Sequence, residues 1–307
     1  MVEIALSLAV IGIALVAILG VLPIGLRMQR ENREQTLINQ DATVLMEHIR
    51  NGTHSPLESD LTNYVYAISN TWTRYNANGS VVGPLVNGYT LGNYSVDPQY
   101  YSDGRPLTSN SNIIGLLSTP EFTDANGQPV PCVMTNGVAA PVPGLDCYSN
   151  HVVAYVRAMS GSAIDRPPQD NGLLRDSSLF YRVVCQNLPT PVLLPPQWSA
   201  GSYSRGAQVY NVQNGQIQFW RSLANANTDT PGSSLLWERD GYTTTLMANA
   251  RELRLTFLWP ELPSGKLGKG NWTYRVSVAG DLLVASNSTP AQIAYFFRPQ
   301  SFTTNAP

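Results

Sequence analysis

Charged residues are scarce in this chain of 307 residues. Asp, Glu, Lys and Arg make up 13% of the sequence, whereas soluble domains average about 25%. Lysine is almost missing, because only Lys266 and Lys269 occur among the 19 cations, and the net charge is −2. Nucleic-acid-binding domains are usually strongly basic, so this charge balance argues against a nucleic-acid site.

Residues that carry catalysis are also few. The three histidines are His48, His54 and His151, and the sequence contains no HExxH, GxSxG, P-loop or GxGxxG pattern. The three cysteines do not have the spacing of zinc ligands. We therefore expect no enzymatic activity, no cofactor and no metal site.

One long hydrophobic run stands out near the N-terminus. Residues 4–26 form a stretch of 23 uncharged residues, most of them Ala, Val, Ile and Leu, which is long enough to span a bilayer as a helix. The acid Glu3 precedes this run, where a secretory signal peptide would carry positive charge, and no small-residue cleavage site follows before the first arginine. The pattern predicts a transmembrane helix rather than a signal peptide.

The helical pattern continues beyond the apolar run. Apolar residues recur every three or four positions and would share one helix face: Leu37, Ile38, Ala42, Leu45 and Ile49. One helix is therefore predicted from near residue 4 to near residue 50, with Asn51-Gly52 as its end. Pro23, flanked by Gly20 and Gly25, should kink or loosen it. The apolar face of the second half predicts a protein partner.

The rest of the chain is predicted to be an antiparallel, β-rich head, which makes the fold class α+β. Segments rich in β-branched and aromatic residues alternate with turn signals. The predicted strands are 64–68, 71–75, 152–157, 179–185, 252–259, 272–278 and 294–298. The predicted turns are Asn78-Gly79, Asn87-Gly88, Asp103-Gly104 and Asn126-Gly127. Residues 106–147 are predicted to be mainly long loops, because they are rich in Pro and Gly.

Two cysteines are candidates for a disulfide. Cys132 and Cys147 are 15 residues apart, and a bridge between them would contribute roughly 3 kcal/mol in an oxidising compartment. Cys185 lies in a predicted apolar strand, where we expect a buried free thiol.

The two ends of the apolar run give conflicting signals for topology. Arg27, Arg30 and Arg33 follow the run, which would place the head in the cytoplasm. Candidate glycosylation sequons and the possible disulfide favour the outside. The sequons begin at Asn51, Asn78, Asn93, Asn271 and Asn287.

The N-terminus resembles that of the type IV pilins and the related pseudopilins of type II secretion. The resemblance rests on the sequence MVEIALSLAVIGIALVAILGVLPIGL, with an acid at the start of an apolar run, a helix that continues past it and a β-rich head. It implies that Glu3 pairs with the N-terminal amine of a neighbouring subunit in a filament. The alternative is that Glu3 merely sits at the lipid headgroup level.

The same resemblance suggests roles for small residues and proline in the apolar run. Gly12 and Gly20 would let helices approach closely, or they are simply small residues of a membrane helix. Pro23 lies in the region that resembles the part of the helix that melts in several pilus filaments. Together with Glu3 and the apolar residues Leu37, Ile38, Leu45 and Ile49, these positions form the predicted assembly site.

A second resemblance lies in residues 197–239, which are similar to the small chitin- and cellulose-binding modules of secreted glycosidases. The order of aromatic and Gly positions carries it, and it implies a compact three-stranded β unit. Trp198, Tyr203, Phe219 and Trp237 match positions that chiefly build the core of such a module. Trp220 remains as the best candidate for an exposed glycan contact, with Trp198, Tyr203 and Trp237 as further candidates.

These observations predict four parts and a structural function. The parts are a pilin-like helix (1–52), a first part of the head (53–194), an inserted small β domain (195–241) and a C-terminal part of the head (242–307). We expect a structural subunit of a type IV pilus-like filament that polymerises with copies of itself. A pseudopilin or minor pilin is one alternative, and a membrane-anchored protein that binds surface polysaccharide is another.

The resemblance to pilins also implies partners and locations. The precursor would reside in the inner membrane, meet a prepilin peptidase and the pilus assembly machinery, and end in an extracellular filament on the cell surface.

Overall fold

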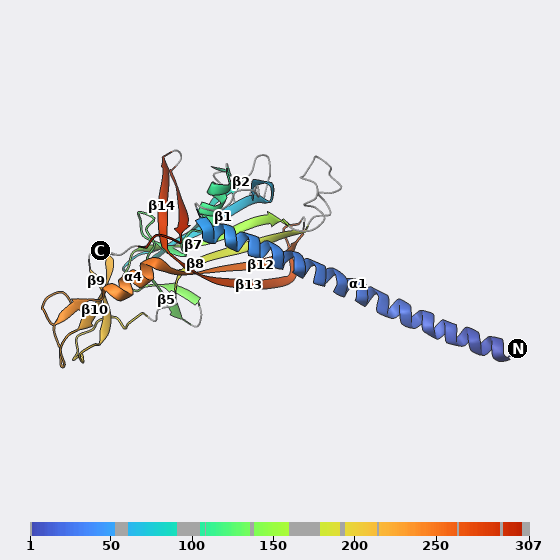
Figure 1. Ribbon diagram of the computed structural model, residues 1–307, viewed down its shortest axis with the longest axis horizontal. Coiled ribbons are helices and arrows are strands. Elements are labelled where there is room, and N and C mark those ends of the chain that lie inside the picture. The colour runs from blue at the N-terminus through green and yellow to red at the C-terminus, as the bar shows by residue number, and fades with distance from the viewer. Residues whose placement is uncertain are drawn as a thin grey trace.

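The computed structural model describes most of the chain. The described residues are 2–52, 61–90, 105–107, 109–135, 138–159, 179–190, 194–213, 215–262, 264–288 and 291–302. They form a long N-terminal helix followed by an antiparallel, β-rich head (Figure 1), so the predicted α+β class is confirmed. Within this part of the chain, no helix meets the length and hydropathy required of a membrane span.

The N-terminal helix α1 (Val2–Asn51) has nearly the predicted bounds. It remains helical through Pro23, so the proline does not break it. Its end is set by Gly52, which adopts a φ of 51° and lies so close to strand β15 (Ala291–Arg298) that a Cβ there would collide with the carbonyl oxygen of Phe297. A positive φ favours glycine, and the predicted Asn51-Gly52 stop is confirmed.

One large sheet forms the centre of the head. Its path runs β13 (Leu267–Ala279), β12 (Ala250–Glu261), β8 (Phe180–Pro189), β7 (Cys147–Arg157), β1 (Val65–Tyr75), β2 (Val81–Thr90) and β3 (Arg105–Pro106). The short strand β4 (Phe122–Thr123) also pairs with β7, and among the described strand pairs only β2–β3 is parallel. The segments 64–68 and 71–75, predicted as two strands, form the single strand β1 preceded by the short helix η2 (Leu61–Asn63).

The core lies between α1 and one face of this sheet. Burial alternates along β8 and β12, so that Tyr181 and Val183 on β8 and Leu255 and Phe257 on β12 point toward the helix. Strict alternation is the mark of a sheet with one covered face. Cys185 belongs to the same face and is a buried free thiol, as predicted.

Residues 106–147 contain more regular structure than predicted. Helix α2 (Asn110–Leu117) begins at Ser109, whose side chain accepts a hydrogen bond from the Asn112 amide, and it buries Ile113, Ile114, Leu116 and Leu117. Strands β5 (Cys132–Thr135) and β6 (Val138–Pro141) form a hairpin. A short helix of this kind gains its stability from packing against the rest of the head. The Pro and Gly content on which the loop prediction rested does not reveal such packing.

A second hairpin projects from the head in Figure 1. It consists of β14 (Asp281–Ser288), which was not predicted, and β15 (Ala291–Arg298), which was. Its base packs on α2, where a Cβ on Gly115 would crowd Ala294 and Phe296.

The predicted turns had mixed outcomes. Gly79 and Gly127 have φ values of 82° and 76° and lie in turns, as predicted. The Asn87-Gly88 prediction is wrong, because these residues lie inside β2 and pair with Asn70 and Ser69 of β1. Continued pairing with a neighbouring strand overrides the local turn preference. Asp103-Gly104 lies outside the described residues.

The predicted small β domain contains a separate three-stranded sheet. Its strands are β9 (Gln208–Gln213), β10 (Gln216–Ser222) and β11 (Trp237–Arg239). Tyr210 and Phe219 pack against Val142, Leu145 and Met247, the last from helix α4 (Gly241–Asn249), and this contact attaches the sheet to the rest of the head. The four-part division of the chain stays a prediction.

The predicted disulfide is absent from the structure. Cys132 and Cys147 are free thiols in one buried cluster with Phe122 and Leu188. Burial raises the pKa of Cys132 to about 12 and the pKa of Cys147 to about 11. Since disulfide exchange requires a thiolate, this environment keeps both groups in the unreactive thiol form.

A buried carboxyl group lies near these thiols. Burial raises the pKa of Glu121 to about 7, although a hydrogen bond with Gln186 and the charge of Arg254 lower it. Its Oε2 atom has no hydrogen-bond partner. The Glu121 carboxyl group of the folded chain therefore stays protonated at pH values at which a glutamate of the unfolded chain is ionised.

This proton predicts a pH dependence of stability. Between about pH 4.5 and about pH 7 the folded state binds more protons than the unfolded state, so the free energy of unfolding should fall as the pH rises. Glu121→Gln should remove this part of the slope and should be more stable than the parent at about pH 8. Urea denaturation at several pH values measures it, with the exposed Glu47→Gln as control. A slope unchanged by Glu121→Gln would contradict the assignment.

Candidate assembly surface

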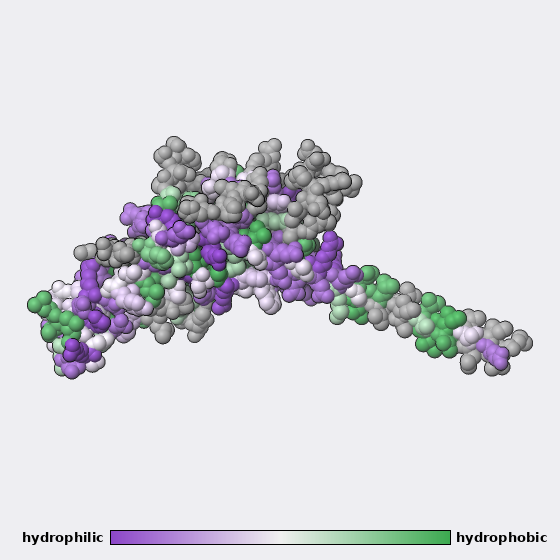
Figure 2. Space-filling view, viewed as in Figure 1, coloured by the Kyte–Doolittle hydropathy of each residue, from purple (hydrophilic) through white to green (hydrophobic). Residues whose placement is uncertain are grey.

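The described side chains of the first half of α1 expose a large apolar surface. Nine large apolar side chains are each 52–72% exposed: Val10, Ile11, Ile13, Leu15, Val16, Leu22, Ile24, Leu26 and Met28. Figure 2 shows this part of the helix as green hydrophobic patches that reach well beyond the head. Burying one such side chain gains roughly 1.5–3 kcal/mol, so water is a poor solvent for this surface.

The head begins to cover the helix only at Glu34. None of the described side chains before that residue is buried. At 1.5 Å per residue, the uncovered segment is about 48 Å long. Residues 4–26 of this segment are uncharged, and a helix with so much exposed apolar surface is stabilised by packing against other apolar surfaces.

The polar and small residues of the predicted assembly site lie on this uncovered segment. Glu3 is exposed in the first turn, and Gly12 and Pro23 are exposed within the apolar stretch. No atom outside the helix's own local backbone lies within 4 Å of a Cβ built on Gly12, so another helix could approach there. The surroundings of Gly20 lie outside the described side chains. The roles of these four residues stay predictions.

The predicted assembly role of the second half of α1 needs correction. Ile38, Leu45 and Ile49 are at most 1% exposed, because they pack into the core of the chain's own head. Leu37 is half-buried beside them. The spacing correctly predicted an apolar face that binds protein, but its partner is this chain's sheet, so three of these residues cannot contact a neighbouring subunit.

A buried carboxylate, which sequence reasoning missed, lies within this apolar face. Asp41 is 0% exposed between Ile38 and Ala42. Its Oδ2 atom accepts a hydrogen bond from the Met159 amide at 2.9 Å and another from the Tyr181 hydroxyl at 2.9 Å. Burial, followed by the charge of Asp41, raises the pKa of Tyr181 well above its ordinary value. An acid in the middle of an apolar helix face was the sequence signal.

A second polar contact joins the helix to the edge of the sheet. The Tyr274 hydroxyl on β13 donates a hydrogen bond to Oδ1 of Asn39. The ring of Tyr274 packs edge-on against Phe257 with 5.5 Å between the centroids. Hydrogen bonds on both sides of an apolar contact fix the rotation of a helix about its axis. Apolar packing alone specifies this rotation less strictly.

The aromatic residues of the predicted carbohydrate-binding-like unit build its core. Trp220 and Trp237 are 8% and 5% exposed and pack with Val209, while Trp198 and Tyr203 cover the same cluster. The rings of Tyr203 and Trp237 meet edge-on at 5.3 Å. The predicted core role of Trp198, Tyr203, Phe219 and Trp237 is confirmed.

The prediction of Trp220 as an exposed glycan contact is wrong. Phe219 and Trp220 are adjacent on β10 and both buried, because Phe219 packs toward the head and Trp220 into the small core. Gly232 lies against the Trp220 ring, and the Arg239 guanidinium lies 5.7 Å from its centroid. Sugar binding needs an open aromatic face, and Trp220 has none.

The candidate glycosylation sites differ in accessibility. Asn78 and Asn271 are exposed, and Asn51 is half-buried at the end of α1. The Asn78 side chain accepts hydrogen bonds from the Ser80 amide and hydroxyl at 2.9 and 2.7 Å. Asn93 and the side chain of Asn287 lie outside the described residues.

Comparisons with known proteins do not identify a family for this chain. No family model, curated protein or solved structure matches the chain. In the described ranges, no group of three or more His, Cys, Asp and Glu side chains could hold a metal ion. The helix surface is therefore the feature from which function has to be argued.

The buried Asp41 predicts a large stability effect. Asp41→Ala should lower the free energy of unfolding by about 2–4 kcal/mol, because it leaves the Tyr181 hydroxyl and the Met159 amide without this acceptor. Chemical denaturation of the full chain measures it. The exposed Glu47→Ala on the same helix is the control, and equal losses for the two variants would show that Asp41 has no special role.

Proposed function

We propose that the chain is a structural subunit of a type IV pilus-like filament and polymerises through the exposed half of α1. The observation that carries the proposal is the division of one helix into two parts. The second part is fixed in the core of the head, and the first presents about 48 Å of uncovered, largely apolar surface. A helix held rigidly at one end can insert into a bundle of copies without refolding of the head.

The same surface suits two successive environments. Residues 4–26 are uncharged and long enough to lie in the inner membrane before assembly. In a filament, the apolar side chains would leave lipid and pack against neighbouring copies. Processing by a prepilin peptidase and extraction by the pilus assembly machinery would connect the two states and place the head on the cell surface.

Glu3 would set the register between copies. A charged carboxylate in an apolar bundle requires a partner, and the N-terminal amine of a neighbouring subunit supplies an opposite charge at the corresponding height. Gly12 and Gly20 would permit close approach of helices, and Pro23 would supply a place where the helix can adjust locally.

Alternative functions differ in what they require of the structure. A pseudopilin or minor pilin would use the same helix in the same way, in a shorter or rarer assembly. A membrane-anchored polysaccharide-binding protein would need exposed aromatic faces in the 195–241 unit, and the burial of Trp220 and Trp237 disfavours this reading.

Assembly from purified full-length chain tests the proposal. After detergent removal, electron microscopy and sedimentation should show filaments of the parent. Ile13→Glu should lower the sedimented fraction at least tenfold, because it places a charge on the apolar surface, whereas Gln35→Glu adds the same charge at an exposed position outside that surface. Glu3→Gln should also reduce assembly.

The outcomes separate the readings. A parent that stays monomeric, or an Ile13→Glu variant that assembles as well as the parent, would contradict the filament proposal. A Glu3→Gln variant with unchanged assembly would favour the headgroup position for Glu3 over its pairing with a neighbour.

A further inference from the structure

Three leucines form an exposed apolar patch at one end of the head. Leu223, Leu235 and Leu236 are 42%, 94% and 41% exposed, and we call them the leucine tip. They belong to residues 195–241, which we call the small β unit and which lie at the end of the molecule farthest from the N-terminus of α1 (Figures 1 and 2). Exposed apolar patches on otherwise polar proteins mark interaction sites.

The leucine tip is held by a network of hydrogen bonds. The Leu223 amide donates to the Leu236 carbonyl at 2.9 Å, and the Asn227 side-chain amide donates to the same carbonyl at 3.1 Å. The Leu236 amide donates to the Ser234 hydroxyl at 3.2 Å. The loop therefore presents its leucines in a fixed geometry and does not fold them back into the small core.

A second apolar patch lies at the opposite end of the head. Leu262 and Leu267 are 46% and 37% exposed at the turn between β12 and β13, and Trp272, which pairs with Phe257 farther along β13, is 52% exposed. We call these three residues the hairpin end. Arg182 holds both sides of this turn, because it pairs with Glu261 at 2.7 Å and donates to the Gly265 carbonyl at 2.8 Å.

The two loops themselves differ in charge. Both lysines of the chain, Lys266 and Lys269, are exposed at the hairpin end, whereas residues 262–280 contain no acid. The loop 223–236 contains no cation and one acid, Asp229. A contact between the two patches would bury leucines against leucines and bring opposite charges to its rim.

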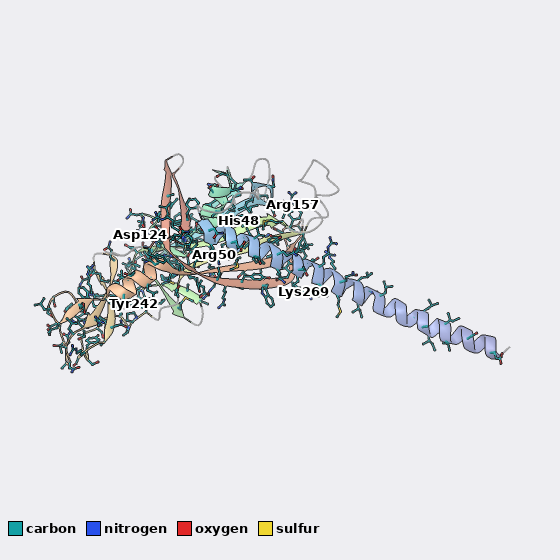
Figure 3. All side chains as sticks on the ribbon, viewed as in Figure 1. His48, Arg50, Asp124, Arg157, Tyr242 and Lys269 are labelled. Carbon is teal, nitrogen blue, oxygen red and sulfur yellow. The ribbon has the colours of Figure 1, made fainter. Side chains whose placement is uncertain are left out.

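The placement of the patches favours a head-to-tail contact between copies. Figure 3 shows Lys269 where α1 leaves the head and Tyr242 toward the other end, next to the small β unit. Two different patches at opposite ends make a heterologous contact, which extends into an open array and does not close into a dimer. Because α1 leaves beside the hairpin end, the helix of one copy would run alongside the head of the next (Figure 1).

We propose that heads stack along the long axis of the molecule, with the leucine tip of one copy bound to the hairpin end of the next. This contact rests on the proposed function, because α1 aligns the copies, but it is a second interface made by different residues. It gives the small β unit a role as a connector between subunits.

Cysteine cross-linking of the full chain tests the contact. Leu235→Cys and Leu267→Cys are combined in one chain, assembled by detergent removal and oxidised mildly. Because each chain then carries one thiol at each end, head-to-tail stacking should give a ladder of dimers, trimers and longer species on non-reducing gels. The native Cys132, Cys147 and Cys185 are buried and should contribute little.

Controls and microscopy make each outcome decisive. Each single variant should give no ladder, and Leu235→Cys with Val138→Cys, which is 68% exposed on β6, should give at least tenfold less trimer. Filaments without a ladder would overturn the head contact and leave helix-driven assembly intact. A ladder without filaments would support the contact and contradict the proposed function, and the absence of both would overturn both.

Discussion

The carboxylate of Asp41 joins the two parts of this molecule. It lies fully buried in the apolar face of α1 and accepts hydrogen bonds from the Met159 amide and the Tyr181 hydroxyl. A buried carboxylate is stable only with such partners, so this contact allows one rotation and one height of the helix on the sheet. The first half of α1 takes its direction from that contact.

The rigid attachment to the head keeps the first half of α1 exposed. Nine large apolar side chains between Val10 and Met28 face outward, and a flexible tether would let them collapse onto the head. Fixed as they are, they remain available to lipid or to other copies. The head is less charged than an average domain, and its exposed leucines at one end and lysines at the other suit a surface that meets copies of itself.

Sequence reasoning was strongest where periodicity decides the structure. The bounds of α1 and the strands β8, β12 and β13 followed from spacing and residue type. The packing role of Trp198 and Trp237 was implied by the resemblance to chitin- and cellulose-binding modules. It failed where distant residues decide. The sequence places an acid, Asp41, on an apolar helix face but does not show Tyr181 as its partner. Asn87-Gly88 is a turn signal until β1 pairs with it. Trp220 is a candidate for exposure until Val209 and Trp237 enclose it in the small core while Phe219 faces the head.

In the proposed filament, α1 holds the copies of this chain together. Purification of filaments from the surface of the cells that make this protein, with mass spectrometry of their subunits and imaging of the filament core, tests it most directly. We expect this chain to be a subunit and residues 2–33 to line the core, with the heads outside. Recovery of the protein only as monomers in membrane fractions would contradict it.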